Sequence, residues 1–486
     1  MEENSVPLLY SFTMRTASSV LIVIAALMFA ACGTAPDQMT DPVRPDPEEV
    51  PPEPLFDPEE EAYESISLAI SLGDPEQAIA AYEEAQLEDP DAPDTQVLLA
   101  NLYLTAGSVD DALAILQDVL ERDPENEAAL LAAALISGHR GDRGRARDLL
   151  EQLVELNPQQ AQAQAALGEL QLRDRRYAPA EQAFSASLEH EPDNLVALVG
   201  MGNLKLRRDD PAAAEEYLDR AVETAPEFPF AYSDRSRARA LQQRFAEAEE
   251  DLGRAIELDQ DFLWHYYDRG KVRLERNNFS GAIDDFNQAI ERDPTVFMTY
   301  VYRARAYDRL QEREEAIADY RTALELRPDY QPGMVPLAVL LFETGRFAEA
   351  ADKFGEAHRE RNENDPTDYG IILLSALSRK LAGDESGARR YLEQRARDLS
   401  GSGLYADMAR YYLNPGSDAY IYREVTRESD RFLKTRMNFF LAGQYEVLDR
   451  TSSARALYRE VVDEDLRGFV ETRLARNRLG ELQGQP

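Results

Sequence analysis

Small and large apolar residues recur at fixed places along most of the chain, with a period of 34 residues. One register holds alanine nine times in succession, at Ala78, Ala112, Ala146, Ala180, Ala214, Ala248, Ala282, Ala316 and Ala350. A large apolar residue follows four places later each time, at Tyr82, Leu116, Leu150, Phe184, Leu218, Leu252, Phe286, Tyr320 and Phe354. This spacing places each pair on one face of a helix, and a fixed period of this length indicates a solenoid.

Two further registers divide each repeat into helices A and B. When repeats are counted from residues 59, 93, 127 and so on, position 8 on helix A is small, so that the two helices can approach closely. It is Ala100, Ala134, Gly168, Gly202, Ser236, Gly270, Ala304 and Ala338, and only Ile66 departs from the rule. Proline ends helix B in most repeats, at Pro90, Pro124, Pro158, Pro192, Pro226, Pro294 and Pro328, with Gln260 in the one gap.

This combination of period, small residues and closing proline resembles the tetratricopeptide repeat (TPR). The resemblance covers nine repeats over residues 59–364. It implies an all-α TPR solenoid, a right-handed superhelix of helix-turn-helix repeats. It also implies a concave groove that binds a protein or peptide partner. With the less regular segments that follow, we expect about eleven helical pairs.

The register slips beyond residue 364. Residues 365–436 predict degenerate helical repeats, with Ala388 near the alanine register and a loop or boundary at 400–418, where "SGSG" and "NPGSD" occur. Residues 437–486 predict a TPR-like pair and a capping helix that opens at Phe469. The segments "FFLAGQY", "ARALY" and "FVETRLA" are similar to the ending of NlpI-type TPR lipoproteins of bacterial envelopes. The array here is far longer than in that family, so the resemblance implies no particular partner.

The N-terminus reads as a secretion signal. Residues 20–31 form the apolar run "VLIVIAALMFAA" behind Arg15, which is shorter than the roughly 20 residues of a membrane-spanning helix. The run ends in "FAACG", which resembles a bacterial lipobox and implies lipidation of Cys32 and removal of residues 1–31. A plain signal peptide with a chance cysteine is the alternative. Met14 is the better start, which would make the first 13 residues a misassigned extension.

Residues 32–58 follow as a segment rich in proline and acid. Such a composition cannot bury enough apolar surface to fold, so we expect a disordered tether behind the lipidated Cys32, with a reach of roughly 80 Å. Gly33 stands where sorting rules of diderm bacteria place aspartate for retention in the inner membrane. The rule implies a lipid-anchored protein of the outer membrane that faces the periplasm.

Composition narrows the classes of function. The chain has 91 acids against 53 bases and a net charge of −38, which argues against nucleic-acid binding. A single cysteine excludes a disulfide scaffold and a cysteine-based zinc site. The four histidines occupy four different repeat positions, and no nucleotide-binding loop or hydrolase motif occurs. The glycine string at 138–144 falls at the turn between helices A and B. We therefore expect no metal, no cofactor and no catalytic residues.

Three consecutive repeats carry a basic and aromatic block. Position 7 is Arg235, Arg269 and Arg303, and position 23 on helix B of the same repeats is Asp251, Asp285 and Asp319. Opposite charges at this spacing predict ion pairs that brace helix A against helix B. These arginines then belong to the structure rather than to a binding site.

Position 9 of the same repeats is also cationic, at Arg237, Lys271 and Arg305, and no acid on helix B matches it. In TPR solenoids positions 2, 5, 9 and 12 of helix A face the concave groove. Positions 2 and 5 supply an apolar stripe, Phe230, Trp264, Met298 and Tyr267. These seven residues predict a partner-binding groove for a peptide with acidic groups or a free C-terminal carboxylate. The alternative is that the charges only neutralise neighbouring acids on adjacent helices.

The sequence thus favours a membrane-anchored TPR scaffold or adaptor of the bacterial envelope that is not an enzyme. Two other classes stay open. One is a structural component of an envelope assembly or secretion complex, which would need a broad apolar surface. The other is an envelope hydrolase, for which no sequence feature speaks.

Overall fold

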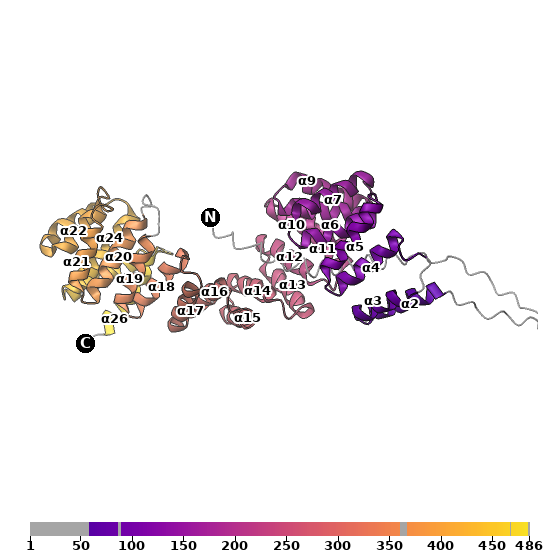
Figure 1. Cartoon of the computed structure of the whole chain (residues 1–486). Coiled ribbons are helices and arrows are strands. Elements are labelled where there is room, and N and C mark those ends of the chain that lie inside the picture. Colours follow the sequence, from indigo (N-terminus) through magenta and orange to yellow (C-terminus); the bar gives the residue numbers. More distant parts are fainter. Residues whose placement is uncertain (1–57, 86–88, 360–366, 467, 485–486) are drawn as a thin grey trace, which may run out of the picture. The chain divides into compact units, whose positions relative to one another are not determined.

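The computed structural model describes residues 58–85, 89–359, 367–466 and 468–484, and the regular structure in these ranges is helical throughout (Figure 1). The predicted signal, Cys32 and nearly all of the tether lie outside the described residues. The chain divides into two compact units, Met1–Gln260 and Asp261–Pro486, and each is described here by itself. The boundary falls inside the predicted array of nine repeats. The prediction of an all-α solenoid of helix-turn-helix repeats is confirmed.

The described residues of the first unit contain six pairs of helices. They are α2 (Pro58–Ser71) and α3 (Pro75–Glu84), α4 (Pro93–Thr105) and α5 (Val109–Arg122), α6 (Glu127–His139) and α7 (Arg143–Leu156), α8 (Ala161–Arg173) and α9 (Tyr177–His190), α10 (Leu195–Arg207) and α11 (Pro211–Thr224), and α12 (Pro229–Leu241) and α13 (Phe245–Leu258). From α4 onward every helix A begins at repeat position 1 and every helix B at position 17. The helices therefore keep the register that the sequence predicts.

The second unit continues with the same pairs and then departs from them. The regular pairs are α14 (Leu263–Glu275) and α15 (Phe279–Arg292), α16 (Phe297–Arg309) and α17 (Arg313–Leu326), and α18 (Gln331–Glu343) and α19 (Phe347–Arg359). The remaining elements are α20 (Thr367–Leu381), α21 (Glu385–Gln394), α22 (Leu404–Leu413), the 3-10 turn η1 (Pro415–Ser417), α23 (Asp418–Arg427), α24 (Arg431–Val447), α25 (Thr451–Asp463) and α26 (Val470–Gly484).

The core forms where the small and large registers meet. The alanines of position 20 and the large residues of position 24 are all buried. A Cβ atom built on Gly168 would lie 2.7 Å from the Phe184 ring, and one on Gly270 would lie 2.6 Å from the Phe286 ring. Position 8 is small because helix B presses its position-24 side chain against the backbone of helix A.

The turn between helices A and B adopts the same left-handed backbone conformation in all nine repeats. Its central residue has φ between +59° and +87°, at Gly73, Gly107, Gly141, Arg175, Asp209, Gln243, Asn277, Gln311 and Gly345. Glycine adopts this conformation without strain, and asparagine and aspartate adopt it more readily than other residues. Gly141 occupies this turn, with Gly138 at the end of α6 and Gly144 at the start of α7, so the glycine string at 138–144 falls at the A–B turn, as the sequence predicted.

The expectation of a loop at 400–418 is wrong for its central part, where helix α22 forms. Its apolar residues recur on one helical face, and Tyr405, Met408, Ala409, Tyr411 and Tyr412 are buried. The glycine-rich and proline-rich flanks that suggested a loop instead mark the two ends of this short helix.

The last helix returns to the regular repeats. Helix α26 packs on α25 and α24 and also contacts α18, which lies more than 100 residues earlier in the chain. None of the helices in the described ranges has the length and apolarity that crossing a membrane requires. In the same ranges no group of three or more metal-ligating side chains is arranged to hold an ion.

Candidate partner-binding site on helices α14 and α16

The predicted brace between helices A and B is present in all three repeats. Arg235 donates to Asp251 at 3.1 and 2.6 Å. Arg269 and Asp285 meet at 2.7 Å, and Arg303 donates to Asp319 at 2.8 and 2.7 Å. The three aspartates are buried, so each pair is a charge-assisted contact out of bulk water. This prediction is confirmed, and the position-7 arginines are structural.

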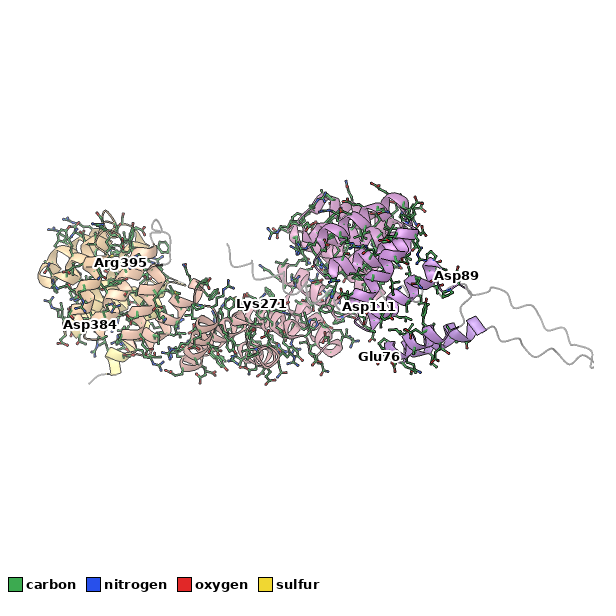
Figure 2. All side chains as sticks on the ribbon, in the orientation of Figure 1. Glu76, Asp89, Asp111, Lys271, Asp384 and Arg395 are labelled. Atoms are coloured by element: carbon green, nitrogen blue, oxygen red, sulfur yellow. The ribbon has the colours of Figure 1, made fainter. Side chains whose placement is uncertain are left out.

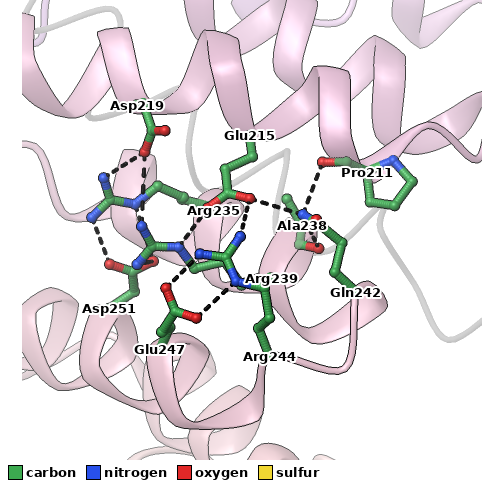
Figure 3. Close-up of polar contacts among 10 residues, drawn as sticks. All are labelled: Pro211, Glu215, Asp219, Arg235, Ala238, Arg239, Gln242, Arg244, Glu247 and Asp251. Carbon is green, nitrogen blue, oxygen red and sulfur yellow. Dashed lines mark hydrogen bonds and ion pairs between the residues drawn. The ribbon is translucent and has the colours of Figure 1, made fainter.

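In the first unit the brace extends into a longer network (Figure 3). Arg239 also donates to Asp251, at 2.9 Å, and to Glu215 on α11, at 2.9 Å. Arg235 reaches Asp219 on α11 at 2.9 Å. Arginines and carboxylates therefore alternate across α11, α12 and α13. The brace predicted from the sequence did not include position 11, although Arg239 lies one helical turn from Arg235 on the same face.

Burial and pairing act in opposite directions on these charges. Burial raises the pKa of Asp251, although the guanidinium groups of Arg235 and Arg239 favour its charged form. Burial also works against a charged Arg235, yet its hydrogen bonds to Asp251 and Asp219 leave the pKa of Arg235 raised. The carboxyl group of Glu215 has a lowered pKa, because hydrogen bonds from three side chains outweigh its burial.

Two of the three position-9 cations have an acid on their own helix. Arg237 lies 3.3 Å from Asp234, which also accepts a 2.8 Å hydrogen bond from Asn203 on α10. Lys271 lies 3.6 Å from Asp268. Both acids occupy position 6, three residues before the cation, a spacing that brings side chains together on a helix. Acids of the same helix therefore neutralise Arg237 and partly Lys271, whereas the alternative drawn from the sequence placed such acids on adjacent helices.

Arg305 differs because its repeat has Tyr302 at position 6. The guanidinium lies over the Tyr302 ring, 5.3 Å from the centroid, and no ion pair joins Arg305 to a carboxylate in the described part of the chain. The ammonium group of Lys271 lies 5.3 Å from the ring centroid of Tyr267 and 5.8 Å from that of Tyr302. Lys271 and Arg305, the position-9 cations of the second unit, thus both lie against the ring of Tyr302.

The aromatic rings beneath these cations contact one another. Trp264 packs edge-on against Tyr267 with centroids 5.2 Å apart, and Tyr267 packs edge-on against Tyr302 at 5.6 Å. We call Trp264, Tyr267, Lys271, Tyr302 and Arg305 the aromatic–cation cluster. It joins α14 to α16 within the second unit, and Figure 2 labels Lys271 on α14.

Exposure separates the core of this cluster from its surface. Tyr267 is 2% exposed, and burial raises the pKa of its hydroxyl, so this residue stays protonated and structural. Met298 and Phe230, at 7% and 5% exposed, are likewise buried. The surface open to a partner is therefore carried by half-buried Trp264 and Tyr302, by Lys271, and by exposed Arg305.

The predicted stripe is divided between the two units. Phe230 and Arg237 lie on α12 in the first unit, whereas Trp264, Tyr267, Lys271, Met298 and Arg305 lie in the second. The structure brings the members on α14 and α16 together. A single groove that runs through all seven residues stays a prediction.

Comparisons with known proteins agree with the repeat architecture. Two models of the tetratricopeptide repeat match the chain, one at residues 69–136 and 171–241, the other at 131–194, 267–331 and 303–368. Together they span more than half of the chain. No curated protein matches it.

Several solved structures share the repeat at low identity. A tetratricopeptide repeat protein from Parabacteroides merdae is 20% identical, with 51% of this chain and 98% of that one covered and a TM-score of 0.40. PilW, a type IV pilus biogenesis factor, is 22% identical, with 42% and 94% covered and a TM-score of 0.40. YrrB, a TPR protein with an unusual peptide-binding site, is 20% identical, with 38% and 95% covered and a TM-score of 0.32. On the family models, the chain belongs to the tetratricopeptide repeat proteins, whose repeats mediate protein–protein interaction.

Proposed function

We propose that this protein is a lipid-anchored, non-catalytic adaptor of the bacterial envelope that binds a protein or peptide partner through the aromatic–cation cluster. The observation that carries the proposal is Arg305. This residue is exposed, its guanidinium lies over a tyrosine ring, and no carboxylate in the described residues pairs with it. Most other arginines of the same repeats are paired with acids of the chain itself.

The chemistry of the cluster favours an acidic partner. A carboxylate that approaches Arg305 can accept two parallel hydrogen bonds from its planar guanidinium. Lys271, whose contact with Asp268 is long at 3.6 Å, offers a second donor on the neighbouring helix. Trp264 and Tyr302 lie beside these charges and supply apolar surface that a partner can bury. Charges fix the register of the bound segment, and the rings supply the burial.

The location of the protein is proposed from its N-terminal sequence. The apolar run before Cys32 and the proline-rich segment after it suit a lipidated cysteine and a tether. Two or more acyl chains suffice for stable anchoring in a bilayer. We place the protein in the outer membrane, facing the periplasm, because Gly33 follows the cysteine.

Photo-crosslinking in cells tests the binding site. A photoreactive amino acid replaces Trp264, so that Lys271 and Arg305 both remain, and crosslinked partners are identified by mass spectrometry. We expect a discrete partner that disappears in the variant Arg305→Glu. The matched control is Arg309→Glu, because Arg309 is exposed on the same helix and its guanidinium lies over Phe279 instead.

The two variants carry the same charge change one helical turn apart. Loss of the partner in Arg305→Glu alone supports recognition by the cluster. A crosslink that is indifferent to both variants, or equally lost in both, would contradict it. A crosslink to the same chain would show instead that the cluster packs within the protein.

A further inference from the structure

The C-terminal helix α26 makes an ionic contact with two helices far away in the sequence. Arg473 donates to Asp308 on α16 at 2.8 and 2.7 Å, and to Glu343 at the end of α18 at 2.8 and 2.6 Å. Asn477, one turn further along α26, donates to the backbone carbonyl of Glu343 at 3.1 Å. Two residues on one face of α26 thus hold the A helices of two successive repeats.

The surface that α26 occupies continues the face of the aromatic–cation cluster. Asp308 is position 12 of its repeat, a groove-facing position in TPR solenoids, and it follows Arg305 by one turn of α16. The next A helix, α18, has neither cations nor tyrosines at positions 5 and 9, which are Val335 and Val339. The residues from Leu337 to Glu343 on α18 are all buried. This half of α18 is buried on every side and therefore needs cover on every side, and α17, α19 and α26 all pack against α18.

The ionic part of this contact is open to water, whereas the apolar face of α26, at Leu474 and Ala475, is fully buried. The Arg473 side chain is 36% exposed, so water and salt reach it, whereas Glu343 is only 3% exposed. Gly468, two residues before α26, has φ of +76° and gives the connection a residue that adopts many conformations. If Arg473 left, Asp308 would lose its guanidinium partner and Glu343 would keep only Arg313 among the described residues, at 3.3 Å, so the two carboxylates would form a site for another guanidinium.

We propose that α26 is an internal ligand of this face, and that the face of α16 and α18 accepts an arginine-bearing helix of another protein when α26 leaves it. The partner helix would carry an arginine and, four residues later, an amide donor, as Arg473 and Asn477 do. This surface is distinct from the aromatic–cation cluster, because it recognises a cation and the cluster recognises an anion. The inference does not rest on the proposed function.

A peptide of the chain itself is the probe. A fluorescent synthetic peptide of residues 468–486 is titrated into three full-length proteins, and its anisotropy is measured. The proteins are the wild type, Arg473→Glu and the control Arg476→Glu. Arg476 is 61% exposed on the same helix, and its contact with Asp465 is long, at 3.9 Å. In Arg473→Glu an acid faces Asp308 and Glu343, so the resident helix is repelled.

We expect the peptide to bind Arg473→Glu at least tenfold more tightly than the wild type or Arg476→Glu. A peptide in which alanine replaces Arg473 should lose this advantage. Equal affinity for all three proteins, or no binding to Arg473→Glu, would overturn the inference. Circular dichroism checks that each variant keeps its helical content.

Hydrogen exchange of the unmodified protein gives a second test that no folding defect can obscure. Salt screens an exposed ion pair. We therefore expect the amides of α26 to exchange faster than those of α24 and α25, with a difference that grows in 1 M sodium chloride. Equal protection of the three helices at both salt concentrations would refute a detachable α26. Crosslinking from position 264 reports on the cluster separately, so the two proposals fail independently.

Discussion

The brace between α12 and α13 leads to a quantitative prediction for Asp251→Asn. The carboxylate of Asp251 is 3% exposed and accepts three hydrogen bonds, two from Arg235 and one from Arg239. The substitution keeps the shape of the side chain and one acceptor oxygen, but it removes the charge. The guanidinium groups of two arginines, whose side chains are 14% and 15% exposed, would then face a neutral amide.

The magnitude follows from what each arginine retains. Removal of one partner from a fully buried ion pair costs about 3–5 kcal/mol. Here Arg235 keeps Asp219 and Arg239 keeps Glu215, and the amide oxygen still accepts a hydrogen bond. The loss is then one or two charge-assisted hydrogen bonds, which gives a destabilisation of about 2–3 kcal/mol.

The matched control is Asp219→Asn, which removes the same charge from the other side of Arg235. Asp219 is 45% exposed, and its one hydrogen bond to Arg235, at 2.9 Å, lies near water. An exposed pair of this kind contributes less than about 1 kcal/mol. The two substitutions therefore compare the loss of a buried carboxylate with the loss of an exposed one at the same arginine.

Unfolding in urea at pH 7, followed by circular dichroism, gives the change in stability, because urea does not screen charges as guanidinium chloride does. Repeat arrays open locally, so hydrogen exchange of α12 and α13 should report the loss at the site. Equal costs for Asp251→Asn and Asp219→Asn would refute the reasoning from burial. A stabilised Asp251→Asn would show that the cost of burying the carboxylate exceeds the gain from pairing.

Three other predictions concern single positions. The pKa of Glu215 is lowered in the folded protein, so its ionised carboxylate stabilises the fold fully above the unfolded pKa of about 4.5. This stability is lost as the pH falls through the folded pKa. Glu215→Gln should therefore flatten the loss of stability between about pH 5 and pH 3, measured by urea unfolding at each pH. Gly270→Ala should lower the free energy of unfolding by about 1–3 kcal/mol, because the new Cβ would meet the Phe286 ring at 2.6 Å. Its control is Gly253→Ala on α13, where a Cβ would have no atom within 4 Å and should raise the free energy of unfolding by about 0.5–1 kcal/mol. Cys32→Ser should abolish incorporation of labelled palmitate and release the protein from membranes in cell fractionation.

The regular part of the fold could be predicted because its contacts join residues that are close to one another in the sequence. The position-8 and position-24 residues of one repeat stand 16 apart, as do the braced Arg235 and Asp251. Each such contact lies inside one helical pair, so a single period fixes all of them. The same reasoning failed at α22, where the flanking glycines and prolines outweighed ten residues of helical pattern.

The candidate site was only partly predictable. The repeat register placed Trp264, Lys271 and Arg305 on groove positions, but it could not tell which large side chains fold down against a neighbouring helix. Tyr267 and Met298 do so and are buried. The contact between Arg473 and Asp308 spans 165 residues, and no periodicity connects residues so far apart.

The identical A–B turns have a consequence for how such an array changes in length over evolution. Because each turn from residue 73 to residue 345 bends the backbone at the same repeat position, a duplication or deletion of 34 residues would join two compatible ends wherever it occurs. Repeats before α16 satisfy this condition for the backbone, although side chains such as Arg239 and Glu215 join neighbouring repeats there. The last two repeats do not, because α26 reaches Asp308 and Glu343 from the end of the chain. We therefore expect recombination to change the number of repeats before α16 more readily than the number of repeats that α26 contacts.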